Sequence, residues 1–104
     1  MNIDEDGFLL DPEDWDKEFA KKVSQSYELE LSEDHWLIID LIRELFFETG
    51  IVPELRTILR SLKQKIGKEK ATRKFIYGLY PYGYGQQACK IAGMRKPLKL
   101  WLDL

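Results

Sequence analysis

Residues 32–67 read SEDHWLIIDLIRELFFETGIVPELRTILRSLKQKIG and decide the expected fold. Ser32 is a good N-cap, and the acidic residues that follow it suit the positive end of a helix dipole. Apolar residues then recur with helical spacing until Gly50, which predicts a central core helix. Its apolar positions are Trp36, Ile39, Ile42, Leu45 and Phe46.

A second helix is expected to start at Pro53, directly after a short link, and to end at Gly67. The buried positions of this helix are Leu55, Ile58, Leu59, Leu62 and Ile66, and the outer positions are Arg56, Arg60, Lys63 and Lys65. The pair has helix-turn-helix spacing, so a nucleic-acid-binding regulator is one hypothesis. Long cations suit phosphates better than base edges, however, and an acidic protein partner is the favoured interpretation.

The chain before this pair predicts a turn, a short strand and one more helix. Asp4-Glu5-Asp6-Gly7 is turn-prone and precedes apolar Phe8-Leu9-Leu10, which favours a short N-terminal β-hairpin or strand. Asp11 is expected to cap a helix whose first residue is Pro12 and which ends near residues 24–26. Trp15, Phe19 and Val23 form its apolar stripe.

Residues 67–94 read GKEKATRKFIYGLYPYGYGQQACKIAGM and bring the single cysteine together with several basic residues, tyrosines and glycines. A fourth helix is expected to stop at Pro81, followed by a tight turn through Gly83 and Gly85. Its apolar positions are Ala71, Phe75, Ile76 and Leu79. A short fifth helix from about Gln86 to Ala92 then carries Cys89, the single cysteine. The sequence therefore predicts a mainly α (small α+β) fold, an orthogonal bundle of about five helices.

The composition fits one domain of 104 residues, 44% hydrophobic. No apolar run is long enough for a membrane span, and the acidic start lacks the features of a secretory signal, so we expect a cytoplasmic protein. One cysteine and one histidine argue against an internal disulfide and against a zinc cluster, and we expect no cofactor or metal. Residues 1–50 carry 15 acids and four bases, whereas residues 51–104 carry three acids and 12 bases. This asymmetry can hold the halves together or present a basic face to an anionic partner.

Several motifs resemble one family in the same order. HWLIIDLIRELFFETGIVPELRTI, GKEKATRKFIYGLYPYG and QQACKIAGMRKP, together with the opening DEDGFLLDPEDW, are similar to the DsrC/TusE family, and the resemblance runs from about Gly7 to Pro97. This family includes proteins like the gamma subunit of dissimilatory sulfite reductase and sulfur-relay proteins of tRNA thiolation. The resemblance implies a small helical domain over residues 1–104, with residues 95–104 as its C-terminal arm.

The chain departs from the family pattern at both ends. Family members usually carry a cysteine near the end of the arm, and this cysteine carries sulfur into a partner. The matching position, eleven residues after Cys89, is Leu100, and Cys89 matches the family's upstream cysteine. The first strand of the N-terminal hairpin is short or missing. The resemblance therefore implies a non-enzymatic accessory protein of sulfur trafficking that binds a partner of sulfite reductase or sulfurtransferase type.

Two single residues allow more than one interpretation. Cys89 is the candidate sulfur-binding thiol, and a persulfide carrier that uses Cys89 alone is an alternative function, but a lone cysteine between Ala88 and Lys90-Ile91 also suits a buried apolar site. His35 is expected to be a polar surface or capping residue. The residues expected to contact a partner are Arg56, Arg60, Lys63, Lys68, Lys70, Arg73, Lys74, Tyr82, Tyr84, Lys90, Arg95, Lys96 and Trp101.

The last seven residues, LKLWLDL, place Leu98, Leu100, Leu102 and Leu104 on one side of an extended strand. Burial of these leucines can offset the entropy lost in ordering a short tail. We expect the tail to pack on its own domain, on the N-terminal strand, or on a second copy as an added strand, which leaves a homodimer possible.

Overall fold

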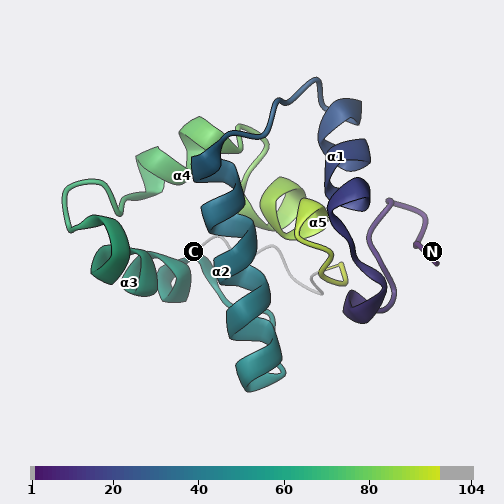
Figure 1. Ribbon diagram of the computed structural model, residues 1–104, viewed down its shortest axis with the longest axis horizontal. Helices are drawn as coiled ribbons and strands as arrows, with labels where there is room; N and C mark the ends of the chain where they lie inside the picture. Colours follow the sequence, from purple (N-terminus) through teal and green to yellow (C-terminus); the bar gives the residue numbers. More distant parts are fainter. Residues whose placement is uncertain (1, 97–104) are drawn as a thin grey trace.

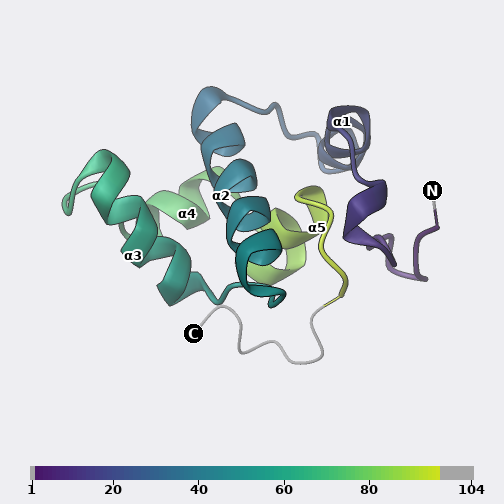
Figure 2. The same cartoon turned by 60° about the horizontal axis from the view of Figure 1, so that its bottom comes forward.

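The computed structural model describes residues 2–96, and helix α2 (Glu33–Thr49) runs through its centre (Figure 1). The residues that point from α2 into the core include Ile38, Ile39 and Ile42, which have no exposed surface. Helices α3 (Leu55–Ile66) and α4 (Arg73–Leu79) lie on one side of α2. Helices α1 (Lys17–Ser26) and α5 (Cys89–Ile91) lie on the other (Figure 2). The expected five-helix, mainly α fold is confirmed.

The ends of α2 follow the signals in the sequence. The Ser32 hydroxyl accepts a hydrogen bond from the His35 backbone N–H at 3.4 Å, and the His35 ring accepts one from the Ser32 N–H at 3.0 Å. This reciprocal arrangement is a capping box, with histidine in the place that glutamate usually takes. Gly50 ends the helix at φ 77°, and its N–H donates to the Phe46 carbonyl.

Helix α3 carries its apolar and basic residues on different faces, as expected. Leu55, Ile58 and Leu62 have no exposed surface, whereas Arg60 and Lys63 are exposed. The helix begins at Leu55, two residues after Pro53, with Glu54 as its N-cap, and Gly67 follows its last residue. α3 packs against α2, as two amphipathic helices joined by a short link should.

The N-terminal part differs from the expectation in two ways. Residues 2–10 form a tight turn with a single antiparallel bridge between Ile3 and Leu9, so the strand detail is not confirmed beyond this bridge. The helix expected to start at Pro12 is split into a 3-10 turn, η1 (Pro12–Asp14), and α1. The split arises because Asp16 is a second N-cap, whose carboxylate accepts from the Phe19 N–H at 2.8 Å.

The region before Cys89 is also more irregular than expected. Thr72 caps α4, so Ala71 lies outside this helix. Gly83 has a φ of 102° and turns the chain, as predicted, but Gly85 lies inside a π-helical segment, η2 (Tyr84–Ala88), which continues directly into α5. Gly85 was therefore wrongly assigned to the turn. The tail and its expected strand periodicity lie outside the described residues.

Candidate functional site

Cys89 is the first residue of α5, and its side chain has no exposed surface. It belongs to the core cluster, together with Tyr80, Tyr84, Ile91 and Met94. Its carbonyl accepts a hydrogen bond from the Met94 N–H at 3.0 Å, which closes the end of α5. The candidate sulfur atom therefore lies inside the domain, where burial disfavours a thiolate.

Tyr80, in the same core cluster, shows that this part of the core disfavours negative charge. Its hydroxyl donates to the His35 carbonyl at 2.8 Å, and the His35 ring meets the Tyr80 ring edge-on at 5.1 Å. Burial raises the pKa of Tyr80 far above its usual range, and negative charge on Cys89 and Asp40 would raise it further. The surroundings therefore favour the neutral form of the phenol.

His35 is a buried capping residue, with 7% of its surface exposed. Its Nε2 lies 2.8 Å from the Leu79 carbonyl, which can only accept, so Nε2 carries the proton and Nδ1 accepts from Ser32. The expected capping role is confirmed, whereas a surface position is wrong. The reason is tertiary, because the partner carbonyl comes from α4, 44 residues later.

Trp15 and Arg43 hold the end of α5 in place. From the sequence, Trp15 was expected only in an apolar stripe, and nothing was expected of Arg43. Trp15 Nε1 donates to the Ile91 carbonyl at 2.9 Å. Arg43 donates to the Ala92 carbonyl at 2.8 Å and to the Pro12 carbonyl at 2.9 Å, and its guanidinium lies 4.1 Å from the centre of the Trp15 ring. These two side chains, here called the Trp15–Arg43 clamp, join α2 and the N-terminal turn to the segment after Cys89.

Gly93 completes this arrangement. It has a φ of 80°, and a Cβ atom built on it would lie within 2.8 Å of three Trp15 atoms. Partial burial lowers the pKa of Arg43, although a guanidinium remains charged at any ordinary pH. Two features of the sequence could have indicated the clamp. One is Arg43, a cation among the apolar residues of α2, and the other is Gly93, a glycine shortly after Cys89.

Seven predicted partner-binding residues belong to α3, α4 and the loop between them. All seven are exposed, and we call them the basic surface: Arg56, Arg60, Lys63, Lys68, Lys70, Arg73 and Lys74. Arg56 pairs with Glu54 at 2.7 Å. Only two acidic residues, Glu54 and Glu69, occur in residues 54–74, so this surface carries a clear positive excess.

A second group of predicted residues lies near α5. Tyr82 is 67% exposed, and its ring lies 5.5 Å from that of Tyr27. Lys90 is half-buried and donates from Nζ to the Tyr27 hydroxyl at 3.3 Å. This group lies on α5 and the chain before it, across α2 from the basic surface, so the structure does not bring the two groups together.

The remaining predicted residues have different surroundings. Arg95 is exposed, and Lys96 forms an ion pair with Asp6 at 2.5 Å, which lowers the pKa of Asp6 and raises that of Lys96. Tyr84 was expected on the surface but has no exposed area, because its hydroxyl donates to the Pro53 carbonyl and its ring fills the core. Trp101 lies outside the described residues.

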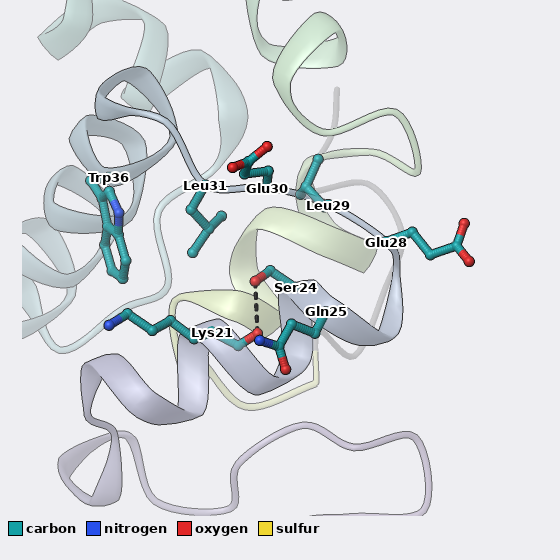
Figure 3. Close-up of a pocket in the computed structure, with 8 residues that line it drawn as sticks. All are labelled: Lys21, Ser24, Gln25, Glu28, Leu29, Glu30, Leu31 and Trp36. Atoms are coloured by element: carbon teal, nitrogen blue, oxygen red, sulfur yellow. Dashed lines mark hydrogen bonds between the residues drawn. The ribbon is translucent and has the colours of Figure 1, made fainter.

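Two surface pockets lie along α1, and Cys89 lines neither of them. One, of about 380 Å³, lies between α1 and the link to α2, where Lys21, Leu31 and Trp36 approach one another (Figure 3). The other, of about 560 Å³, has Phe19, Lys22 and Lys90 among its lining residues. Residues 2–96 hold no group of three or more histidine, cysteine or acidic side chains placed to bind a metal, and no helix among them is long and apolar enough to cross a membrane.

Comparison with known proteins finds relatives over nearly the whole chain. The family model described as "DsrC like protein" matches residues 1–100. The chain is 38% identical to sulfurtransferase TusE of Photorhabdus laumondii, over 95% of this chain and 89% of that protein. It is 37% identical to TusE of Buchnera aphidicola from Schizaphis graminum, over 90% of this chain and 82% of that protein.

Solved structures show the same fold. The NMR structure of Allochromatium vinosum DsrC matches with a TM-score of 0.83 and 40% identity, covering 93% of this chain and 87% of that one. The oxidized gamma subunit of dissimilatory sulfite reductase from Archaeoglobus fulgidus matches with a TM-score of 0.82 and 36% identity, covering 93% and 89%. The chain therefore belongs to the DsrC-like protein family.

Proposed function

We propose that this protein is a non-enzymatic accessory of a sulfur relay, which acts by binding a protein partner and does not perform the arm-thiol carrier step. The names of its relatives support a role in sulfur transfer, because they are sulfurtransferase TusE and the gamma subunit of dissimilatory sulfite reductase. The partner is then of sulfite reductase or sulfurtransferase type. Residues 1–104 act as one domain, in which residues 95–104 take the place of the family's arm.

The burial of the only thiol carries the proposal. Sulfur transfer between proteins requires a thiolate that can attack a sulfur atom on another molecule, so the reacting group must be accessible. Cys89 has no exposed surface, and the position of the arm thiol is Leu100. A chain with this arrangement can still use its body to bind the partner that sulfur-carrying relatives bind.

The basic surface is the proposed docking surface. Its side chains are long and exposed, and their excess positive charge would attract an acidic patch on the partner and speed association. The core residues of α3 lie on the opposite side of this helix, so changes in surface charge should leave the fold intact.

Binding to dissimilatory sulfite reductase that lacks its gamma subunit tests the proposal. The double variant Arg60→Glu with Lys63→Glu should weaken binding at least tenfold, and the loss should shrink as salt rises. The matched control, Lys17→Glu with Lys22→Glu, changes the net charge equally on exposed positions of α1 and should bind within about twofold of the wild type.

Three results would count against this assignment. Equal losses of affinity in both double variants would show that the basic surface is not part of the interface. Preference for one duplex DNA sequence over random duplex by about a thousandfold at physiological salt would favour the regulator hypothesis instead. Loss of binding in a Cys89→Ala variant that is still folded would show that the protein uses its thiol to bind the partner.

A further inference from the structure

The larger of the two pockets is a groove of about 560 Å³ between α1 and the N-terminal turn. We call it the α1 groove. Its lining residues come from three separate parts of the chain: the turn of residues 2–10, the segment of α1 with the residue that caps it, and α5. The turn lies beside α1 (Figure 1). A concave site of this size, built from several segments, is typical of pockets that hold small ligands.

One wall of the α1 groove is apolar. Ile3 of the N-terminal turn lines it and is 53% exposed. Phe19 and Val23 line it from α1, where they lie one helical turn apart and therefore on one face of the helix. The apolar body of a ligand would be removed from water against this wall, which is favourable.

Lys90 brings a positive charge into these apolar surroundings. Its side chain is half-buried, and its ammonium lies 5.5 Å from the centre of the Phe8 ring and 5.4 Å from that of Tyr27. Gly7 leaves room for it, because a Cβ atom there would lie 3.1 Å from the Lys90 Cε. Within residues 2–96 the ammonium makes one hydrogen bond, to the Tyr27 hydroxyl at 3.3 Å. An ammonium has three N–H donors, so Lys90 can also donate to a ligand.

The acidic side chains along the α1 groove are engaged, whereas its lysines are not. The Asp16 carboxylate accepts from the Phe19 N–H at 2.8 Å, and Glu18 forms an ion pair within α1 at 3.6 Å. Across residues 2–96, neither Lys22 nor Lys90 forms an ion pair. The groove therefore offers two ammonium groups that lack a carboxylate partner in the described part of the chain.

We propose that the α1 groove binds a small organic carboxylate, whose apolar body contacts Ile3 and Phe19 and whose carboxylate lies beside Lys90 and Lys22. Hydrogen bonds between an ammonium and a carboxylate are stronger than those between neutral groups. A small inorganic anion would leave the apolar wall in water, and a cationic ligand would meet charges of its own sign. The site includes neither Cys89 nor the basic surface, so it is independent of the proposed function.

An NMR titration of the isotope-labelled full-length protein with sodium octanoate tests the proposal. We expect saturable shifts of the amide signals around the α1 groove, with a dissociation constant of about 1 mM or lower. Acetate has the charge without the apolar chain, and octylammonium has the chain with the opposite charge. Both should bind at least about tenfold more weakly than octanoate.

Two pairs of variants separate this site from general effects. Lys90→Met keeps the apolar part of the side chain, removes its charge and should weaken octanoate binding about tenfold. Its control, Lys17→Met, lies at an exposed position of α1 outside the groove and should bind within about twofold of the wild type. Ile3→Ser should also weaken binding, whereas Ile51→Ser, which removes an exposed apolar side chain elsewhere, should not.

If Lys90→Met disturbs the fold, Lys22→Met must weaken octanoate binding, by about threefold because this lysine is exposed. The absence of saturable shifts up to about 10 mM octanoate would overturn the proposal. Equal affinity for octanoate and octylammonium, or an affinity that neither lysine variant changes, would do the same. Shifts confined to the other pocket, around Trp36, would place the octanoate site elsewhere and also reject it.

Discussion

Gly93 offers the sharpest test of the Trp15–Arg43 clamp. Substitution by alanine adds one carbon at a φ of 80°, within 2.8 Å of three Trp15 atoms, so the indole must shift. Gly50 is the matched control, because its φ is 77° and a Cβ atom there would meet nothing within 4 Å. Both substitutions carry the backbone strain of a left-handed residue, about 1–2 kcal/mol, and only Gly93→Ala also carries the clash.

The magnitude follows from what Trp15 would lose. Its hydrogen bond to the Ile91 carbonyl is worth about 0.5–1.5 kcal/mol. Its contact with the Arg43 guanidinium is worth about 0.5–2 kcal/mol. We therefore expect Gly93→Ala to lower the free energy of unfolding by about 1–3.5 kcal/mol more than Gly50→Ala does. Urea unfolding of the two variants and the wild type measures this difference, and a value below about 0.5 kcal/mol would refute the clamp.

Two other predictions concern the same end of the molecule. Arg43→Met removes two charge-assisted hydrogen bonds and should lower the free energy of unfolding by about 2–3 kcal/mol, while Arg43→Lys should lose about half as much because a single ammonium cannot reach both carbonyls in the same way. A loss no larger than that of exposed Arg56→Met would contradict this. Ion pairing with Lys96 lowers the pKa of Asp6, so the pair adds stability above the unfolded value of about 3.9 and loses it as pH falls through the lowered folded value. Asp6→Asn should therefore be less stable than the wild type at pH 7 and equal to it near pH 2, and an unchanged difference across this range would be inconsistent with the ion pair.

Much of the fold could be predicted because its signals are local. Ser32 and Gly50 mark the ends of α2 through contacts within a few residues, and the apolar spacing of α3 correctly separates its core face from its basic face. The split of the first helix is also local. Asp11 caps the 3-10 turn and Asp16 caps α1, but only the Asp11 signal entered the expectation from the sequence.

The errors arise where distant segments meet. Tyr84 is buried because Pro53 offers its hydroxyl an acceptor 31 residues away, and no local pattern indicates this contact. The Trp15–Arg43 clamp likewise joins three separate parts of the chain. The π-helical segment before Cys89 has no distinctive sequence signal either. The apolar neighbours of Cys89 indicated that the thiol could be buried, but only the three-dimensional structure shows that it is.

Whether the protein works without carrying sulfur on a thiol is tested by the intact mass of the native protein after incubation with polysulfide. We expect an unchanged mass, because Cys89 is enclosed by the core. The urea-unfolded protein is the control and should react at the same cysteine, both with polysulfide and with iodoacetamide. Addition of one sulfur atom to native Cys89, followed by its transfer to sulfite reductase, would show instead that the protein carries sulfur on this thiol.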